Sequence, residues 1–349
     1  MKKLIFSLGL TVCFPLFAMD STSESARQDD TYKTRMSAVQ SAEGKSAEDD
    51  VLSRLIPSHL DNDLCTKTNK KGEKEKVFVP RTQTVNSIML IWTGEGFENV
   101  EDLKKIYYSK GTSTHIVVDK DAQPYRIVED DQVAFYAGPS QWKGVPSVNQ
   151  YCIGIDNIFD GFVPSKSPKE GVILPGDTMS RKWVEWPLNM VDSIGELVAS
   201  EQRKHNIRGR NVLAHSDARM PFGDKWDIGP LFPWKYIRDK FGAAYWPMDH
   251  EINLEDFKDL KEEHYADLIT RFGFPDSNWQ RFKLHFYPGN ISPDLDDATK
   301  KMILNLTIDY YNYEDPIVGG KDEEFRAALD EYLKKNELES IFRSYWEKN

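Results

Sequence analysis

The chain has 349 residues, of which 40% are hydrophobic and 12% aromatic, and this composition suffices for the cores of about two globular domains. Its formal net charge of −11 argues against a nucleic-acid partner, because phosphates bind to basic surfaces. A small or neutral polar ligand is compatible with an acidic chain.

The first 18 residues have the pattern of a secretory signal peptide. Two lysines precede an apolar run from Leu4 to Phe17, and Ala18 stands where signal peptidase would cut. The run is too short to span a membrane, so we expect no transmembrane segment here and predict export to the periplasm, the cell envelope or the medium. A lipid anchor at Cys13 is disfavoured because Val12 is bulky where a small residue is expected.

Residues 19–75 are predicted to form a flexible leader. They are rich in Ser, Asp, Glu and Lys, and such a composition buries too little apolar surface to offset the entropy lost on ordering. Cys65 lies in this leader and Cys152 in an apolar segment further on. An export compartment permits a disulfide between them, but two free thiols are an equally open alternative.

Residues 76–250 alternate short apolar runs with helical patterns, which is typical of an α/β layer architecture. The predicted strands are Ile88 to Trp92, His115 to Val118, Tyr125 to Val128, Ile153 to Asp156 and Val212 to Ala214, and the predicted helices are Val100 to Ser109 and Trp186 to His205. The segment from Phe162 to Met179 carries several prolines and glycines and predicts a long surface loop. From residue 251 the apolar residues follow helical spacing, which predicts a small C-terminal helical bundle over residues 251–349.

The segment from Asn211 to Trp234 carries the strongest chemical signal. His215, Lys225 and Asp227 stand on one stretch after an apolar strand, and such side chains can hold a metal ion and polarise a carbonyl. A Gly-Pro turn and an aromatic cluster at the end of the segment would fix its conformation. The segment resembles the last signature of the zinc-dependent N-acetylmuramoyl-L-alanine amidases, the family that includes amidase-type phage lysozymes and peptidoglycan recognition proteins.

Other motifs of that family follow in the expected order upstream, but three are altered. In SIMLIWT, which begins at Ser87, Ile91 stands where the family has a zinc-binding His. In AFYAG, Tyr136 replaces a central His, and in CIGID, Asp156 replaces the catalytic Glu. The carboxylate of Asp156 reaches roughly 1.5 Å less far, about the length of one carbon–carbon bond. The resemblance covers about residues 86–240.

The resemblance implies a mixed central sheet flanked by helices, with a Zn²⁺ site at its edge. His215 and Asp227 would be the metal ligands, Lys225 would stabilise the developing oxyanion, and Asp156 would take a proton from the attacking water. Ile91 is unable to bind a metal. His115, on a neighbouring strand, and Glu95, just after the altered strand, are the conceivable replacements.

Each of these candidate site residues could instead have a purely structural role. His215 could be a hydrogen-bonded residue at a strand end, Asp156 a strand-end cap, and Lys225 with Asp227 a loop ion pair of little energetic value. The candidate substrate contacts are His115, Tyr136 and Trp92. The structural alternative is a buried structural His and two space-filling aromatic residues.

The helical segment after residue 250 resembles the peptidoglycan-binding module attached to some amidases of this family. Three hypotheses follow. The chain could be an exported amidase that cuts the bond between N-acetylmuramic acid and L-Ala with a zinc-activated water. It could instead be a catalytically degenerate relative that binds peptidoglycan or muropeptides without cleaving them. More remotely, it could be an exported interaction protein.

Overall fold

The computed structural model describes residues 54–59, 66–68, 71–72, 74–76, 78–94 and 96–347. All of them belong to one compact unit, which covers residues 48–349. The predicted signal peptide, with Cys13, and the predicted ligand candidate Glu95 lie outside the described residues, as does Cys65. Cys152 is a buried, free thiol. No described helix is long and apolar enough to cross a membrane.

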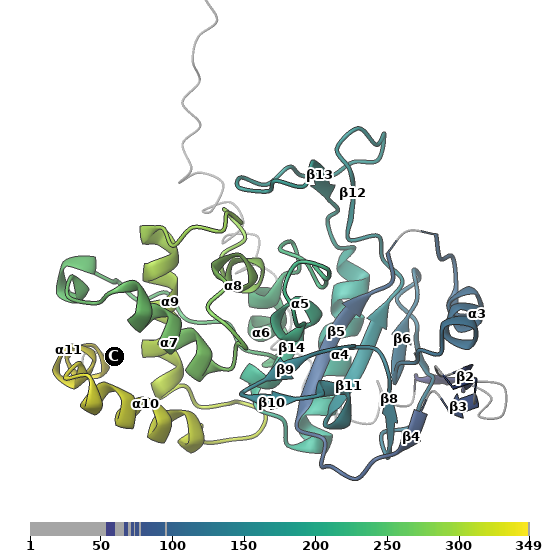
Figure 1. Ribbon diagram of the computed structural model, residues 1–349, viewed down its shortest axis with the longest axis horizontal. Helices are drawn as coiled ribbons and strands as arrows, with labels where there is room; N and C mark the ends of the chain where they lie inside the picture. The colour runs from purple at the N-terminus through teal and green to yellow at the C-terminus, as the bar shows by residue number, and fades with distance from the viewer. Residues whose placement is uncertain are drawn as a thin grey trace, which may run out of the picture. The chain divides into compact units, whose positions relative to one another are not determined.

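A six-stranded mixed sheet forms the centre of the α/β part (Figure 1). Its order is β1 (Ile56–Pro57), β7 (Pro124–Arg126), β6 (Ile116–Val118), β11 (Cys152–Asn157), β5 (Ser87–Trp92) and β14 (Val212–Ala214). β6 and β7 run antiparallel, whereas the other neighbours are parallel. The mixed sheet with flanking helices that the family resemblance implied is therefore confirmed.

The two faces of this sheet have different partners, because successive residues of a strand point to opposite sides. One face carries Ile88 and Leu90 of β5 with Ile153 and Ile155 of β11, and it packs on α4 (Leu188–His205). The opposite face of the same strands carries Met89, Ile91, Cys152, Gly154 and Asp156. This second face, at its carboxyl end, bears the candidate site.

Smaller elements surround the sheet. The remaining strands pair as β2 (Thr66–Thr68) with β3 (Lys74–Lys76), β4 (Phe78–Pro80) with β8 (Gln132–Ala134), β9 (Gln141–Trp142) with β10 (Val145–Pro146), and β12 (Phe162–Pro164) with β13 (Arg181–Trp183). The helices of this part, besides α4, are α3 (Val100–Lys110), α5 (His215–Ala218) and α6 (Trp234–Phe241), with 3-10 turns η1 (Val148–Gln150) and η2 (Gly209–Asn211). The predicted surface loop, which starts at Phe162, thus begins with β12, and β12 pairs antiparallel with β13.

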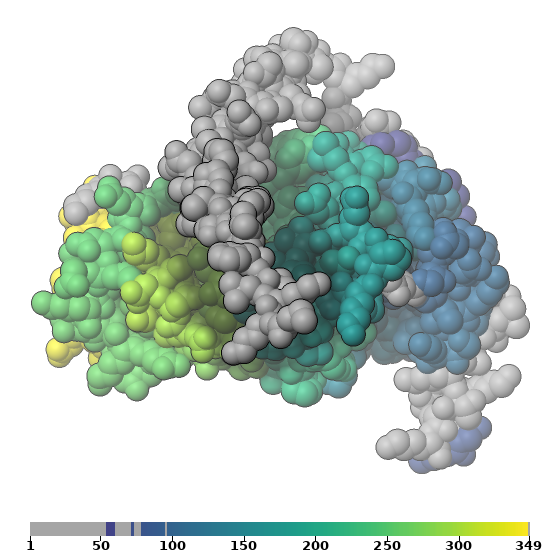
Figure 2. Space-filling model, turned by 90° about the horizontal axis from the view of Figure 1, so that it is seen from above, coloured from purple at the N-terminus to yellow at the C-terminus, as the bar shows by residue number. Residues whose placement is uncertain are grey.

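The helices after residue 250 pack beside the α/β layer (Figure 1, Figure 2). They are η3 (Leu254–Phe257), α7 (Glu262–Phe272), α8 (Trp279–Phe286), α9 (Asp297–Asn312), α10 (Glu323–Lys335) and α11 (Glu339–Trp346). A single buried cluster joins Met89 and Leu213 of the sheet to Phe272 and Phe286 of these helices. The predicted helical segment is confirmed, while the domain boundary at residue 250 stays a prediction, since apolar packing is continuous across it.

Candidate functional site

The candidate site lies where three neighbouring parallel strands end. Asp156 of β11 is paired in register with Ile91 of β5, and Leu90 is paired with Ala214 of β14. His215 follows Ala214 directly as the first residue of α5. The carboxyl ends of parallel strands are the usual place for ligands in α/β sheets, so Asp156, Ile91 and His215 occupy adjacent positions at such an edge.

His215 and Asp227 form a buried pair. The His215 Nδ1 atom lies 2.8 Å from Asp227 Oδ2, and the two residues are 1% and 3% exposed. The Ser216 backbone N–H donates to the Asp227 carbonyl at 2.7 Å, which ties the loop back onto α5. The sequence therefore brings together the two predicted ligands, although His215 begins a short helix rather than lying on a loop.

Both ring nitrogens of His215 face oxygen atoms. Nε2 lies 3.0 Å from the Ala137 carbonyl, which only accepts hydrogen bonds, so Nε2 carries a proton. A neutral ring then presents a lone pair from Nδ1 to the carboxylate of Asp227. This lone pair and the carboxylate are complementary only when a proton or a metal ion lies between them. A carbonyl that orients the second nitrogen is also typical of metal-binding histidines.

The two carboxyl groups of the site differ in acidity. Burial pushes the pKa of Asp227 upward, but the charge and hydrogen bond of His215, followed by the charge of Lys225, hold it below its ordinary value. In contrast, burial raises the pKa of Asp156 to about 6, and the nearby negative charge of Asp227 adds to this shift. The pair of carboxyl groups is thus poised for different protonation states near neutral pH.

Only one of the two oxygens of the Asp156 carboxyl group has a hydrogen-bond partner among the described residues. The Tyr107 hydroxyl of α3 donates to Asp156 Oδ2 at 2.8 Å and opposes the pKa rise. The second oxygen, Oδ1, is buried and has no hydrogen-bond partner among the described residues. A buried acceptor costs stability unless a ligand or a water molecule donates to it.

Lys225 is exposed on the loop between α5 and Asp227. Its charge lowers the pKa of both Asp156 and Asp227, so its ammonium group lies within electrostatic range of the two carboxyl groups. The four residues predicted as ligands and catalytic groups are therefore brought to one edge of the sheet. Their chemical roles stay predictions.

Trp92 fixes the loop that carries Asp227. Its ring packs edge-on against Phe162 and tilted against Trp183, with centroids 6.0 and 6.1 Å away. Gly229, at φ +82°, lies so close that a Cβ atom there would stand 2.5 Å from the Trp92 ring. Trp92 thus has a structural role in holding the Asp-Ile-Gly-Pro turn, and its predicted contact with substrate stays a prediction.

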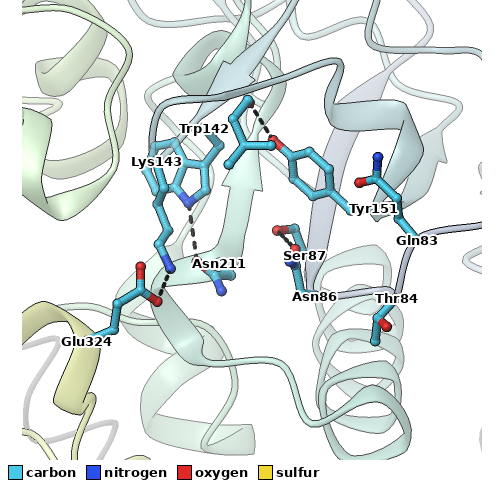
Figure 3. A pocket seen from close by; sticks show the side chains of 10 residues that line it. Gln83, Thr84, Asn86, Ser87, Trp142, Lys143, Tyr151, Asn211 and Glu324 are labelled. Atoms are coloured by element: carbon cyan, nitrogen blue, oxygen red, sulfur yellow. Dashed lines mark hydrogen bonds and ion pairs between the residues drawn. The ribbon is translucent and has the colours of Figure 1, made fainter.

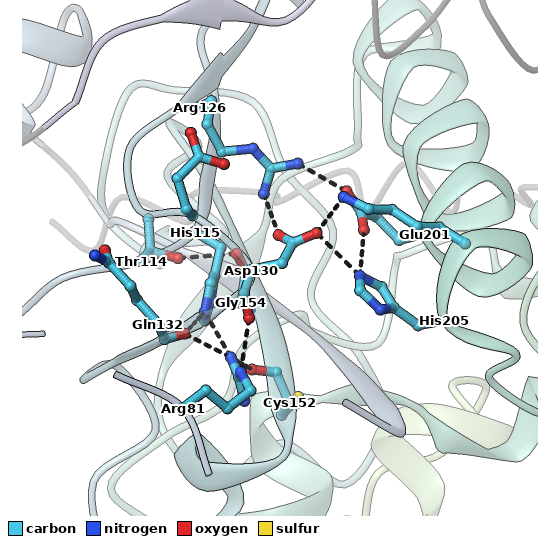
Figure 4. A network of polar contacts seen from close by, with 12 residues as sticks. Arg81, Thr114, His115, Arg126, Asp130, Gln132, Cys152, Gly154, Glu201 and His205 are labelled. Carbon is cyan, nitrogen blue, oxygen red and sulfur yellow. Dashed lines mark hydrogen bonds and ion pairs between the residues drawn. The ribbon is translucent and has the colours of Figure 1, made fainter. Parts of the chain in front are cut away.

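His115 and Tyr136 lie together under the same face of the sheet. Nδ1 of the fully buried His115 accepts from the Gly154 N–H at 3.0 Å, and its Nε2 lies 3.1 Å from the Gln132 carbonyl and 2.8 Å from Arg81 Nη2 (Figure 4). Burial and then the charge of Arg81 lower the pKa of His115 to about 3, so it is neutral. Both ring nitrogens are engaged by protein groups.

Tyr136 covers Gly154 of β11. A Cβ atom on Gly154 would meet the Tyr136 ring at 2.6 Å, and the Tyr136 hydroxyl donates to the Cys152 carbonyl at 2.8 Å. The replacement of a family His by Tyr at this position thus fills space over the strand. The predicted substrate contacts of Tyr136 and His115 stay predictions. The sequence did not reveal which buried groups these two side chains hydrogen-bond.

Sequence reasoning missed the support that the C-terminal helices give to the site. Arg281 of α8 is fully buried, and its Nη1 donates to the carbonyls of Ser216, Asp217 and Arg219 at 2.9, 3.0 and 2.8 Å. His285 Nδ1 of the same helix lies 2.7 Å from Asp217 Oδ2. Hydrogen bonds from α8 therefore fix the position of α5, which begins with His215.

The described residues do not provide the three ligands of a catalytic zinc site. Such sites use three protein ligands and one open position, and here His215 and Asp227 supply two. Ile91 is 6% exposed and apolar, so the adjacent strand position offers no donor atom. Among the described residues, three side chains with metal-binding atoms within 4.8 Å of one another occur only at Asp130, Glu201 and His205.

That second cluster is already neutralised by cations. Arg126 donates to Asp130 at 2.5 Å and to Glu201 at 2.9 Å, and His205 Nε2 lies 2.9 Å from Asp130 (Figure 4). Burial would lower the pKa of His205, but its hydrogen bonds to Asp130 and Glu201 raise it to about 9. The cluster is an ion network at the end of α4, separate from the residues around His215.

Comparisons with known proteins agree with the family resemblance of the sequence. Residues 81–230 match the sequence model of the family described as N-acetylmuramoyl-L-alanine amidase. The chain is 23% identical over 191 residues to N-acetylmuramoyl-L-alanine amidase AmiD of Escherichia coli (strain K12), covering 50% of this chain and 64% of AmiD. It is 32% identical over 189 residues to Putative N-acetylmuramoyl-L-alanine amidase RC0497 of Rickettsia conorii (strain ATCC VR-613 / Malish 7), covering 53% and 63%. The matches thus span just under two thirds of each relative.

Solved structures show the same fold. AmiD from E. coli, in complex with the substrate anhydro-N-acetylmuramic acid-L-Ala-D-gamma-Glu-L-Lys, superposes with a TM-score of 0.52 at 20% identity, over 68% of this chain and 96% of that one. AmpDH3 from Pseudomonas aeruginosa gives a TM-score of 0.53 at 19% identity, over 65% and 94%. The sequence match and the fold agree: residues 81–230 of this chain are similar to the N-acetylmuramoyl-L-alanine amidase family, and the α/β part has the fold of the solved amidases.

Proposed function

We propose that this chain is an exported, peptidoglycan-directed protein that binds muropeptides with its amidase fold and has lost zinc-dependent cleavage. The observation that carries the proposal is the position of Ile91. It lies beside Asp156 in the sheet and one strand from His215, where the family places a zinc ligand, and it is buried and apolar.

Three features support binding without the metal. His215 and Asp227 satisfy each other as a buried pair, so the site is stable as a polar surface once a proton lies between them. Asp156 keeps a free oxygen, and Lys225 keeps an exposed ammonium group without a hydrogen-bond partner among the described residues. Amide and carboxylate groups of a short peptide match this combination of one acceptor and one cation.

The second candidate function is hydrolysis of the amide between N-acetylmuramic acid and L-Ala. Asp156 favours it, because a carboxyl group with a pKa of about 6 is suited to proton transfer near neutral pH. The retained His215 and Asp227 supply two donors for a zinc ion, which would activate water if a third ligand completed the set. Glu95, outside the described residues, remains the predicted replacement.

Two measurements on purified residues 19–349 test the proposal. Elemental analysis after dialysis should give zinc well below one equivalent, and the protein should pellet with peptidoglycan sacculi without releasing peptide from them. Stoichiometric zinc together with release of the muropeptide stem would show that the second candidate function is correct. Failure to pellet with sacculi would exclude peptidoglycan as the ligand and favour an exported interaction protein.

Export rests on the N-terminal pattern of residues 1–18 alone. Expression of the full chain in a Gram-negative host, followed by fractionation, tests it. The proposal expects the processed chain in the periplasm, with an N-terminus after Ala18, and an unprocessed chain in the cytoplasm would contradict it.

A further inference from the structure

A pocket lies at the amino ends of β5 and β14, at the opposite end of these strands from His215. Its volume is about 380 Å³, within the range of roughly 300–1,000 Å³ that is typical of small-molecule sites. Ser87, the first residue of β5, and Asn211, just before β14, form its floor. His215 follows the other end of β14, and Asp156 of β11 is paired with Ile91 near the other end of β5, so this pocket is separate from the family site.

Neutral polar side chains dominate the pocket (Figure 3). Its lining consists of Gln83, Thr84, Asn86, Ser87, Trp142, Lys143, Val145, Tyr151, Asn211 and Glu324. The only charged groups there, Lys143 and Glu324, neutralise each other at 2.6 Å. A neutral ligand rich in oxygen atoms therefore suits the pocket better than an ion.

Asn211 has a fixed orientation in this pocket. It is 8% exposed, and its Oδ1 lies 3.2 Å from Nε1 of Trp142, which only donates hydrogen bonds. The amide oxygen of Asn211 must therefore face Trp142. Its NH₂ group has no protein acceptor among the described residues and is left as a donor in the lining of the pocket.

Asn86 offers a second amide group to the pocket. The hydroxyl of the buried Ser87 donates to Asn86 Oδ1 at 2.9 Å, which leaves the Asn86 NH₂ group without an acceptor in the described part of the chain. Gln83 adds an exposed amide, and Val145, 48% exposed, adds an apolar contact at the rim. Two amide donors, of which Asn211 is held in orientation by Trp142, beside a small apolar surface match a carbonyl group next to a methyl group.

The wall of the pocket is rigid. The Lys143 N–H donates to the Gly273 carbonyl at 2.8 Å, and the Trp142 ring packs edge-on against Phe274 at a centroid distance of 5.4 Å. A Cβ atom on Gly273 would lie 2.5 Å from the Trp142 ring, so only glycine permits this approach. The C-terminal helices therefore hold Trp142, and through it Asn211, in place.

We propose that this pocket is a second binding site for an N-acetylated amino sugar, whose acetamido carbonyl would accept from Asn211 and Asn86. The sugar hydroxyls would reach Gln83 and Thr84, and the acetyl methyl group would contact Val145. This assignment deepens the proposed function, since such sugars form the glycan strand of peptidoglycan, but it does not depend on events at His215.

Titration of the full 19–349 chain with N-acetylglucosamine, followed by two-dimensional amide and indole NMR, tests the site. The side-chain signals of Asn86, Asn211 and Trp142 should shift saturably, whereas glucose, which lacks the acetamido group, should cause no such shift. Asn86→Ala should weaken binding about fivefold to tenfold, the effect of one net hydrogen bond. Val145→Arg, at the exposed rim, should abolish it without disturbing the fold.

The control is Asp156→Asn at the other edge of the sheet, which should leave this titration unchanged. If it removes the shifts, the sugar binds at the family site and the proposal is wrong. Absence of saturable shifts at Asn211, or binding that survives Val145→Arg, would also overturn it. Pelleting with sacculi in the Val145→Arg variant separates the two proposals, because the proposed function predicts residual pelleting through the family site.

Discussion

Ile91 and Asp156 are paired in register on the parallel strands β5 and β11, at the edge where His215 begins α5. In this arrangement an apolar side chain stands between a carboxyl group and an imidazole. The remaining polar groups compensate locally: Asp227 pairs with His215, and Tyr107 donates to Asp156. The amidase-like fold is thus present around a strand position, Ile91, that offers no donor atom.

Asp156 should make the folded state less stable at high pH. Its folded pKa of about 6 lies above the ordinary 3.8, so the folded chain binds this proton more tightly than the unfolded chain. Its contribution to stability is therefore lost as the pH rises through this window. Asp156→Asn keeps an oxygen for Tyr107 and should raise the free energy of unfolding near pH 7.5 by about 1–3 kcal/mol.

Urea unfolding of both proteins in EDTA, near pH 4 and pH 7.5, measures this effect. The gain from Asp156→Asn should be present at the higher pH and nearly absent at the lower one. An equal difference at the two pH values would show that Asp156 does not titrate in this window.

His205 should stabilise the fold in a different pH window. Its folded pKa of about 9 exceeds the ordinary 6.5, so its contribution is fully present below pH 6.5 and is lost as the pH rises through about 9. His205→Gln should lower the free energy of unfolding at pH 6 and make its decrease with rising pH less steep. His59→Gln, in an exposed pair with Glu129, is the control and should change little. A parallel pH profile of the His205→Gln variant and the wild type would contradict the prediction.

Arg281 should be essential for the stability of α5. Arg281→Met leaves the carbonyls of Ser216, Asp217 and Arg219 without their donor and should cost about 3–5 kcal/mol of unfolding free energy. Arg343→Met, which removes an exposed pair on α11, is the matched control and should change the free energy of unfolding little. Similar losses in both variants by chemical unfolding would mean that the contacts of α8 do not hold the site.

Removal of the C-terminal helices should unfold the amidase-family part. The sheet residues Met89 and Leu213 share one buried cluster with Phe272 and Phe286, so a fragment that ends at residue 250 would expose this apolar surface. We expect the fragment to lack a cooperative thermal transition and to aggregate, as judged by calorimetry and size-exclusion chromatography. A soluble, cooperatively folding fragment would instead support an independent module after residue 250.

The five strands predicted from hydrophobic periodicity correspond to β5, β6, β7, β11 and β14. In contrast, β1 of the same sheet lies within residues 19–75, which the composition had predicted to be a flexible leader, because its pairing with β7 depends on a distant segment. The predicted helices of residues 100–109 and 186–205 correspond to α3 and α4, and α4 begins two residues later because Pro187 precedes its first turn. The clustering of His215, Asp227 and Lys225 followed from the family motif. Local sequence carries such signals because each element is decided largely by its own pattern.

The contacts that decide the roles of individual residues were not predictable in this way. The Arg281 hydrogen bonds join segments more than 60 residues apart, and the Trp142 bond to Asn211 depends on the packing of the C-terminal helices. His115 showed the same limit: its sequence context did not reveal that both ring nitrogens are used inside the protein. Long-range packing, rather than local propensity, fixes these positions.

Zinc titration of the wild-type chain and an Ile91→His variant by calorimetry tests the central claim most directly, with Ile91→Leu as the control for altered packing. We predict weak zinc binding by the wild type and the control. The new His, beside Asp156 and next to His215, should raise the affinity for zinc by more than about tenfold. Tenfold is about the lower end of the effect of a residue that only hydrogen-bonds a metal ligand, and a direct ligand should contribute more. Tight, equal binding by the wild type and Ile91→His would show that another residue completes the site and that the loss at Ile91 has no consequence.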